Sequence, residues 1–149
     1  MKKQNGFTLI ELVIVIIILG ILAVVAVPKF VDLQGDARES TLKGVKSALE
    51  GGATLAYSKA AIEGKEKTGS SIDVNGETVT IAAGYPTADA AGIMKMVDLN
   101  SADWATTTGT PFYIYASSAT TTHAPGTCDV AYTLGVSGAR PTIVVNDGC

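Results

Sequence analysis

The most apolar part of the chain covers residues 7–27, where Glu11 is the one charged residue in a run of mostly aliphatic side chains. A helix over these residues would be roughly 31 Å long, which matches the hydrocarbon thickness of a bilayer. Lys2 and Lys3 precede the run, so we expect the N-terminus to stay in the cytoplasm and the rest of the chain to cross. The pattern predicts a membrane-spanning helix.

Beyond Pro28, apolar positions recur every three or four residues, as on one face of a helix. Gly64 is a stop signal, so we expect this helix to end near Ile62. Proline lacks a backbone N–H, so Pro28 should kink the helix, and Gly20 weakens the same region. The pattern predicts one kinked helix over residues 7–62. Its first half must be covered by lipid or by other copies of the chain. The face shared in the second half comprises Leu42, Val45, Leu49, Gly52, Ala56 and Ala60.

The rest of the chain alternates apolar and polar residues, as strands do. The Asn75-Gly76 pair separates two such runs and predicts a hairpin over residues 72–81. Ile93, Met96 and Val97 would face the core from a short helix over residues 88–99, and Trp104 is expected to anchor the core. Further strands are expected at 111–117, 129–134 and 142–145, and polar loops at 64–71 and 117–127.

These elements predict an α+β fold, in which a small antiparallel β-sheet domain packs on the C-terminal half of a long helical spine. The segments are a leader at 1–6, a membrane half at 7–28, an amphipathic half at 29–63 and a β-sheet head at 64–149.

Composition narrows the function classes. Charged residues make up 17% of the chain and the formal net charge is −3, so we expect no nucleic acid partner. His123 is the single histidine and is expected to be an exposed loop residue. With no phosphate loop, nucleophile elbow or metal-ligand cluster in the sequence, we expect no catalytic residue, metal or cofactor, and a protein that is not an enzyme.

The two cysteines, Cys128 and Cys149, are expected to form a disulfide that ties down the end of the chain. Such a bond requires an oxidising compartment, here the periplasm or cell surface. The alternative is a pair of free buried thiols. A disulfide would bracket the last two predicted strands.

Glu11 decides between readings of the apolar segment. A secretory signal peptide, cleaved near Ala26, usually has an apolar core of about 7–15 residues without an acid. A plain membrane anchor does not explain Glu11 either, because a charge near the middle of a bilayer helix costs roughly 2.5–3.5 kcal/mol.

The stretch GFTLIELVIVIIILGILAVVAVPKF resembles the N-terminus of type IV prepilins: a short basic leader ending in Gly6, then Phe7, Thr8, Glu11 and the uncharged run. The resemblance implies a membrane peptidase that cuts between Gly6 and Phe7 and methylates the Phe7 amine. It also implies assembly roles for Thr8 and Glu11.

In a filament, the Glu11 carboxylate of one copy would meet the Phe7 amine of its neighbour and set the stagger between copies, although Glu11 is also one helical turn from its own Phe7. Gly20 and Pro28 stand where the family has a glycine and a proline. The helix between them is expected to unwind as a subunit moves from bilayer to filament.

Four later stretches are similar to major pilins of mannose-sensitive haemagglutinin (MSHA) pili. They are PKFVDLQGDARESTLKGVKSALEGGA, KAAIEG, GYPTADAAGI and DWATT. The implied protein is stored in the inner membrane, with its leader cytoplasmic and its head periplasmic, and polymerises with itself into a surface pilus for adhesion and biofilm formation. Implied partners are the prepilin peptidase and methyltransferase, an assembly platform, a motor ATPase, and host or environmental surfaces, glycans among them.

Two rivals stay open. A minor pilin or type II secretion pseudopilin shares the N-terminus and differs in abundance and destination. A protein of another class, a membrane-anchored periplasmic binding protein, would never polymerise.

Overall fold

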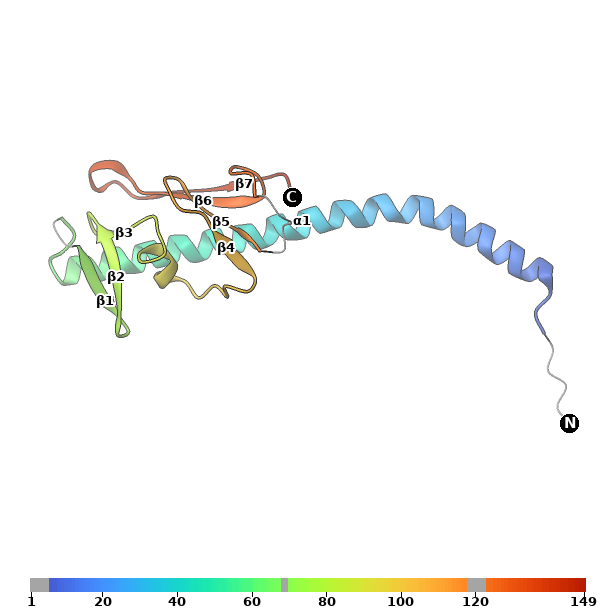
Figure 1. The fold of residues 1–149 in the computed structure, drawn as a ribbon, viewed down its shortest axis with the longest axis horizontal. Helices are drawn as coiled ribbons and strands as arrows, with labels where there is room; N and C mark the ends of the chain where they lie inside the picture. Colours follow the sequence, from blue (N-terminus) through green and yellow to red (C-terminus); the bar gives the residue numbers. More distant parts are fainter. Residues whose placement is uncertain (1–5, 68–69, 118–122) are drawn as a thin grey trace, which may run out of the picture. The chain divides into compact units, whose positions relative to one another are not determined.

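A computed structural model describes residues 6–67, 70–117 and 123–149, with only the backbone described at Asp32 and Ser137. The first five residues of the expected leader, including Lys2 and Lys3, and parts of both expected polar loops lie outside the described residues. The chain divides into two units, Met1–Ala37 and Arg38–Cys149. Helix α1, Leu9–Ile62, contributes to both units (Figure 1).

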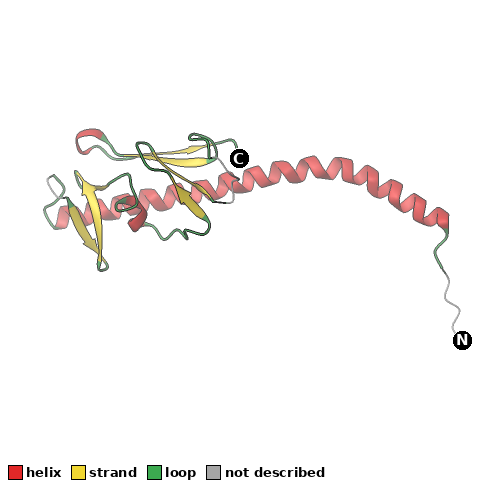
Figure 2. Ribbon diagram, in the orientation of Figure 1, coloured by secondary structure: helices red, strands yellow, loops and turns green. Residues whose placement is uncertain are grey.

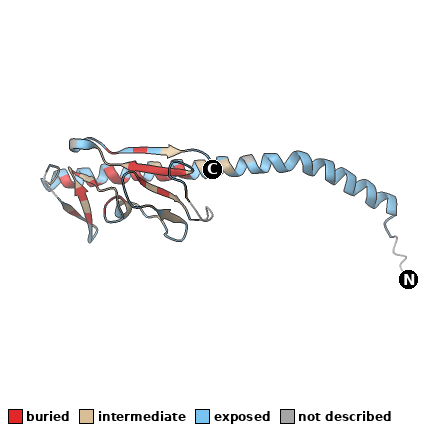
Figure 3. Ribbon diagram, turned by 45° about the horizontal axis from the view of Figure 1, so that its top comes forward, coloured by how far each residue is buried: buried red, intermediate tan, exposed pale blue. Residues whose placement is uncertain are grey.

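The helix ends where the sequence predicts and begins two residues later than predicted, because Thr8 caps it. It continues through Pro28, and it contains one stretch that is long and apolar enough to cross a membrane, none of which is buried. Its second half buries one face, which confirms the predicted stripe (Figure 3). The buried apolar residues on that face are Leu42, Val45, Leu49, Ala53, Ala56 and Ala60.

The predicted hairpin is confirmed: β1 (Ser71–Val74) pairs antiparallel with β2 (Glu77–Ala82). Asn75 and Gly76 have φ angles of 55° and 85°, and a two-residue turn of this kind needs positive φ at both positions. A two-residue strand, β3 (Tyr85–Pro86), which the sequence analysis missed, pairs with β2 and completes a three-stranded sheet.

The second sheet has four antiparallel strands in the order β4-β5-β6-β7 (Figure 2). Three of them fall within a residue or so of the predicted strands: β5 (Phe112–Ala116), β6 (Asp129–Thr133) and β7 (Thr142–Asn146). The edge strand β4 (Trp104–Thr106) was not predicted, and the single sheet expected is in fact two. Trp104 lies half-buried on β4 and packs against the main core.

The expected helix over residues 88–99 is wrong. Only a 3-10 turn, η1 (Ile93–Met96), forms there, followed later by a second, η2 (Val136–Gly138). The Asp89 carboxylate accepts hydrogen bonds from the backbone N–H groups of Ala91 and Gly92, which fixes a turn in place of the first helical turn. Ile93 is nevertheless fully buried, and Met96 and Val97 pack against the core, as predicted.

Two buried clusters hold the head together. The larger joins the α1 face to both η1 and the four-stranded sheet, through Leu42, Val45, Leu49, Ala53, Ile93, Phe112, Ile114, Val130, Tyr132 and Ile143. The smaller packs the end of α1 on the hairpin through Ala56, Ala60, Ile72, Val79 and Ile81. The result is the predicted α+β arrangement, with antiparallel sheets on the C-terminal half of the helix.

Candidate functional site

Reciprocal hydrogen bonds between Thr8 and Glu11 close the first turn of α1. The backbone N–H of Thr8 donates to Oε2 of Glu11 over 2.8 Å, and the backbone N–H of Glu11 donates to Oγ1 of Thr8 over 3.3 Å. The Thr8 hydroxyl also donates to the same carboxylate oxygen over 2.8 Å. This is a capping box, in which each side chain satisfies an N–H group that a helix start leaves without an intrahelical partner.

The capping box gives Glu11 a structural role that the sequence analysis missed. The sequence-based prediction paired Glu11 with the Phe7 amine of a neighbouring copy or of its own chain, and did not include Thr8. The signal was present in the sequence, because Thr8 is followed three residues later by Glu11 and then by an apolar run. Any partner that Glu11 meets in an assembly must therefore compete with Thr8 or share the carboxylate with it.

Gly6 and Phe7 lie in non-helical backbone just ahead of the capping box, and the Phe7 side chain is 92% exposed. Hydrolysis of the peptide bond between them would turn the Phe7 nitrogen into a charged amine, one helical turn from the Glu11 carboxylate. The structure thus brings Gly6, Phe7, Thr8 and Glu11 together at one end of α1.

Gly20 and Pro28 lie farther along the same helix and apart from this group. A Cβ added at Gly20 would meet nothing within 4 Å, so packing inside this chain does not require a glycine there. Whatever selects Gly20 acts through backbone freedom or through a partner that approaches the helix.

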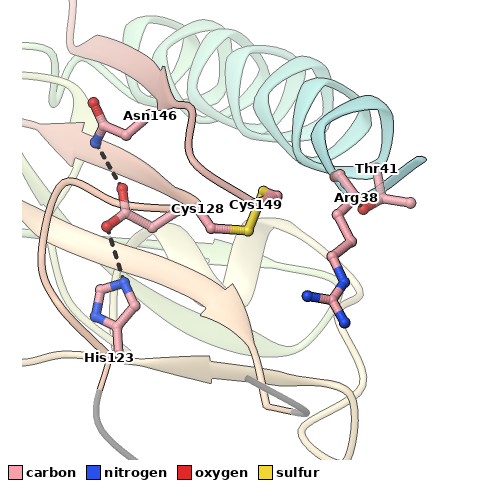
Figure 4. The surroundings of a disulfide bond; sticks show 7 residues. Arg38, Thr41, His123, Cys128, Asn146 and Cys149 are labelled. Atoms are coloured by element: carbon pink, nitrogen blue, oxygen red, sulfur yellow. Dashed lines mark hydrogen bonds and ion pairs between the residues drawn. A yellow bond between two sulfur atoms is a disulfide. The ribbon is translucent and has the colours of Figure 1, made fainter. Parts of the chain in front are cut away.

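Cys128 and Cys149 are joined by a disulfide, with their Cα atoms 4.7 Å apart (Figure 4). Cys128 directly precedes β6, and Cys149 follows the edge strand β7, so the bond closes the end of the sheet. The backbone N–H of Cys128 also donates to the carbonyl of Asp147 over 3.0 Å. The C-terminus is therefore held by a covalent bond and a hydrogen bond together.

The prediction for His123 is wrong. Its side chain is only 6% exposed, its ring stacks on Tyr115 with centroids 3.8 Å apart, and its Nε2 lies 2.9 Å from Oδ2 of Asp129. Asp129 is fully buried and also accepts hydrogen bonds from the Gly126 backbone N–H and the Asn146 side-chain amide. Figure 4 marks the hydrogen bonds that His123 and Asn146 make to this carboxylate. A buried carboxylate needs such donors, which is why the histidine is drawn in from the loop.

Two ionisable groups of the head have shifted pKa values. Burial raises the pKa of Tyr132, whose hydroxyl donates to the Pro86 carbonyl over 2.8 Å and so links the two sheets. The Glu63 carboxylate accepts a hydrogen bond from Lys65, which lowers its pKa at the exposed end of α1. Neither residue lines the two hollows at Leu55, and among the described residues no three His, Cys, Asp or Glu side chains gather as metal ligands.

Comparison with known proteins places this geometry in a family. Residues 1–27 match the model described as the prokaryotic N-terminal methylation motif. The chain is 43% identical to the type IV narrow pilus major component PilA5 of Thermus thermophilus over 42% of this chain and 51% of that protein. It is 36% identical to fimbrial protein Q of Moraxella bovis over 74% of this chain and 68% of that protein.

The chain belongs to the type IV pilin family. Its long helix and small antiparallel sheets form the α+β fold of type IV pilins, a family of structural proteins and not of enzymes. A further relative is the type II secretion system core protein G of Pseudomonas aeruginosa, 44% identical over 32% of this chain and 34% of that protein. No solved structure matches the pilin significantly.

This pilin spans about half the length of the Thermus protein and 40% of a Pseudomonas aeruginosa fimbrial protein to which it is 44% identical over 44% of this chain. What those whole proteins do does not follow from such partial alignments. These alignments establish the family and its fold. They do not establish which assembly this pilin forms.

Proposed function

We propose that this chain is a structural subunit of a type IV pilus, stored in the inner membrane and polymerised into a surface filament that serves adhesion and biofilm formation. One observation carries the proposal: none of the described side chains in residues 6–37 is buried, although most of them are apolar, and they follow a methylation motif. Exposed apolar surface on this scale must be covered by lipid or by other copies of the chain.

Processing would precede assembly. Residues 1–6 form the leader, a prepilin peptidase cuts between Gly6 and Phe7, and the Phe7 amine is methylated. Residues 7–28 then anchor the subunit, with the head in the periplasm. The backbone at Gly6 and Phe7 supports this step, because both residues are exposed and lie outside the helix.

Glu11 would set the register of the filament. In a water-poor environment, a carboxylate and an amine are each stabilised chiefly by the other, and a buried charge pair fixes one arrangement among many. The Phe7 amine of the neighbouring copy is the partner proposed for Glu11, with Thr8 holding the carboxylate in place. Gly20 and Pro28 would let the helix unwind during the transfer from bilayer to filament.

The finer type proposed is an MSHA-like pilus, on the four sequence stretches that resemble those pilins. The partners proposed are further copies of the chain, the processing peptidase and methyltransferase, an assembly platform, a motor ATPase, and host or environmental surfaces. The resemblance covers the helix and the middle of the chain, up to about residue 109. It leaves the surface around the disulfide uncovered, so no sugar preference is proposed.

A second candidate is a minor pilin or a pseudopilin of type II secretion, which the similarity to core protein G favours. The two candidates differ in abundance at the cell surface. A major pilus subunit is recovered in bulk from sheared filaments, whereas a minor subunit or pseudopilin is not.

The deciding experiment is intact mass and N-terminal sequencing of protein sheared from the cell surface. The proposal predicts abundant protein that starts at N-methyl-Phe7, with Cys128 and Cys149 oxidised. A chain that starts near Val27 would mean an ordinary signal peptide and would overturn the filament model. Full retention in the inner membrane, with no sheared protein, would favour the anchored binding protein.

A further inference from the structure

The head carries an open groove between the end of α1, the β1–β2 turn and η1. It encloses about 500 Å³, a volume that accommodates a few side chains. Apolar residues from all three elements line it: Leu55 from α1, Val74 from β1, and Met94 and Val97 from the segment around η1. Leu55 is 59% exposed, so the chain leaves this apolar surface uncovered.

The groove is held in shape by close contacts. A Cβ added at Gly52 would lie 3.0 Å from Cβ of Met96 and 3.1 Å from its carbonyl oxygen, so the glycine lets η1 approach the helix closely. Across the groove, Nζ of Lys95 donates to the Thr78 carbonyl over 2.9 Å and ties η1 to β2. A groove fixed in this way loses little entropy when a partner enters it.

The charges around the groove favour a basic partner. Asp73, Glu77 and Asp98 line it or the adjoining hollow and are exposed, and Glu77 and Asp98 have no ion pair among the described residues. Of the two lysines nearby, Lys59 pairs with Glu63 at 3.4 Å, and Lys95 donates to the Thr78 carbonyl but keeps its charge. The three carboxylates still outnumber these lysines around the groove.

The complementary feature lies on the β6–β7 connection of the same head. Val136, at the start of η2, is 84% exposed, which is the largest exposure among the described large apolar side chains of residues 38–149. Arg140 follows four residues later and is exposed. It is the single Lys or Arg in the sequence after Lys95. This connection thus carries an exposed apolar side chain and an exposed positive charge four positions apart.

The backbone of the connection is built to hold Val136 outward. A Cβ added at Gly135 would clash with the Ala139 carbonyl oxygen, and Gly138 has a φ of 82°, so both positions require glycine. The Ala139 N–H donates to the Val136 carbonyl over 3.1 Å and closes the turn. In Figure 1 this connection and the β1–β2 turn lie on different sides of the head.

We propose that Val136 of one copy inserts into the groove at Leu55 of the next copy, with Arg140 beside the carboxylates of Glu77 and Asp98. Because the two surfaces differ and lie apart on the head, the contact is heterologous and continues from copy to copy instead of closing into a dimer. The inference rests on the proposed function, since it assigns one contact within the proposed filament.

The first test replaces Val136 in the full-length pilin and measures sheared filament protein against total cell pilin. Val136→Asp should lower the filament yield roughly tenfold or more, because it places a charge in an apolar groove. A tenfold weaker association of neighbouring copies corresponds to only about 1.4 kcal/mol lost from one contact. Val136→Thr, which keeps the shape and replaces one methyl group by a hydroxyl, should give a smaller loss. The matched control is Val144→Asp on β7, where the valine is 45% exposed and away from the connection, and it should leave the yield unchanged.

Normal filament yield with Val136→Asp would overturn the inference. So would an equal loss with Val144→Asp, because any new charge on the head would then act alike. If Val136→Asp lowers the total cell pilin, Val136→Thr becomes the deciding variant. A normal filament yield of Val136→Thr, at a normal level of cell pilin, would overturn the contact. A lowered filament yield of Val136→Thr would support it.

The second test exchanges the charges. Arg140→Glu should lower the yield several-fold, and adding Glu77→Lys with Asp98→Lys should restore most of it. A triple variant no better than Arg140→Glu alone would overturn the proposed pairing. If the unsubstituted chain forms no filaments, the proposed function itself fails, which separates that outcome from a failure of this contact.

Discussion

The two halves of α1 differ in how their apolar side chains are covered, although they belong to one continuous helix. In residues 9–37 no described side chain is buried, and aliphatic residues occur on every side of the helix. In residues 38–62 the apolar residues keep to one face, and the chain's own sheets cover that face. The second half is therefore specified by contacts inside the chain. The first half depends on contacts with lipid or with other copies of the chain.

The largest expected effect comes from Glu11, in the half of α1 where no described side chain is buried. We expect Glu11→Val to insert in the membrane and to lower filament yield at least tenfold, because it leaves a partner charge unpaired, at roughly 3–5 kcal/mol for a buried pair. Sheared filament protein against membrane pilin gives the measurement.

Glu11→Gln separates the two roles of Glu11. Glutamine keeps the capping box, since it serves at that position as glutamate does, but it carries no charge. If register depends on the charge, Glu11→Gln assembles as poorly as Glu11→Val. Normal filaments with Glu11→Gln and few with Glu11→Val would show that the cap alone matters, and would remove the pairing with the Phe7 amine.

The next prediction contrasts two leucines of the same helix. Leu49 is fully buried and Leu19 is 58% exposed. Leu49→Ala should lower the free energy of unfolding of the head by about 2–5 kcal/mol, and Leu19→Ala should leave it unchanged. Urea unfolding of the full chain in detergent, followed by the fluorescence of Trp104, measures both. Equal effects would refute the division of the helix into an internally and an externally covered half.

The disulfide stabilises the head chiefly by closing a loop, and its two half-buried cysteines also pack against the main core. The cysteines are 21 positions apart, and closing a loop of this size is worth roughly 3 kcal/mol in the chain-entropy model. We expect the double variant Cys128→Ser with Cys149→Ser to lose about that free energy of unfolding. The unsubstituted chain in reductant is the control and should fall equally; a variant that keeps full stability would contradict the prediction.

A smaller effect is expected from His123. His123→Ala removes one of three donors to the buried Asp129 carboxylate and should cost about 1–3 kcal/mol. Asn146→Ala removes another and should cost a similar amount. Exposed loop substitutions usually stay within about 0.5 kcal/mol, so a cost below that value for His123→Ala would restore the original prediction of a solvated loop residue.

Sequence patterns predicted the parts of the molecule that local chemistry decides. Periodicity gave the buried face at Leu49, and Asn75-Gly76 gave the hairpin, since both depend on residues close together in the chain. His123 and the strand at Trp104 were missed, because their partners, Asp129 and β5, lie elsewhere in the sequence. The failed helix at 88–99 reflects Asp89, whose side chain competes with the helix for backbone N–H groups.

The candidate site divides in the same way. Gly6, Phe7, Thr8 and Glu11 are adjacent, so a short motif sufficed to find them, and the capping box could have been found as well. The groove at Leu55 could not, because it forms only where α1, the β1–β2 turn and η1 meet.

The smallest expected effect concerns pH, and it involves Tyr132 of β6, which packs in the core cluster that covers the second half of α1. Tyr132 is fully buried, and its raised pKa means that the folded state keeps its proton above pH 10, where an unfolded tyrosine loses it. The unfolded state then binds fewer protons than the folded state, so the free energy of unfolding falls as the pH rises above about 10. Tyr132→Phe should flatten this fall, at a cost near neutral pH of about 0.5–1.5 kcal/mol for the lost hydrogen bond to Pro86. Tyr57→Phe, at an exposed position of α1, is the control and should keep the alkaline fall. Urea unfolding of the three proteins between pH 7 and about pH 11 gives the comparison, and an equal slope in all of them would show that Tyr132 ionises as freely folded as unfolded.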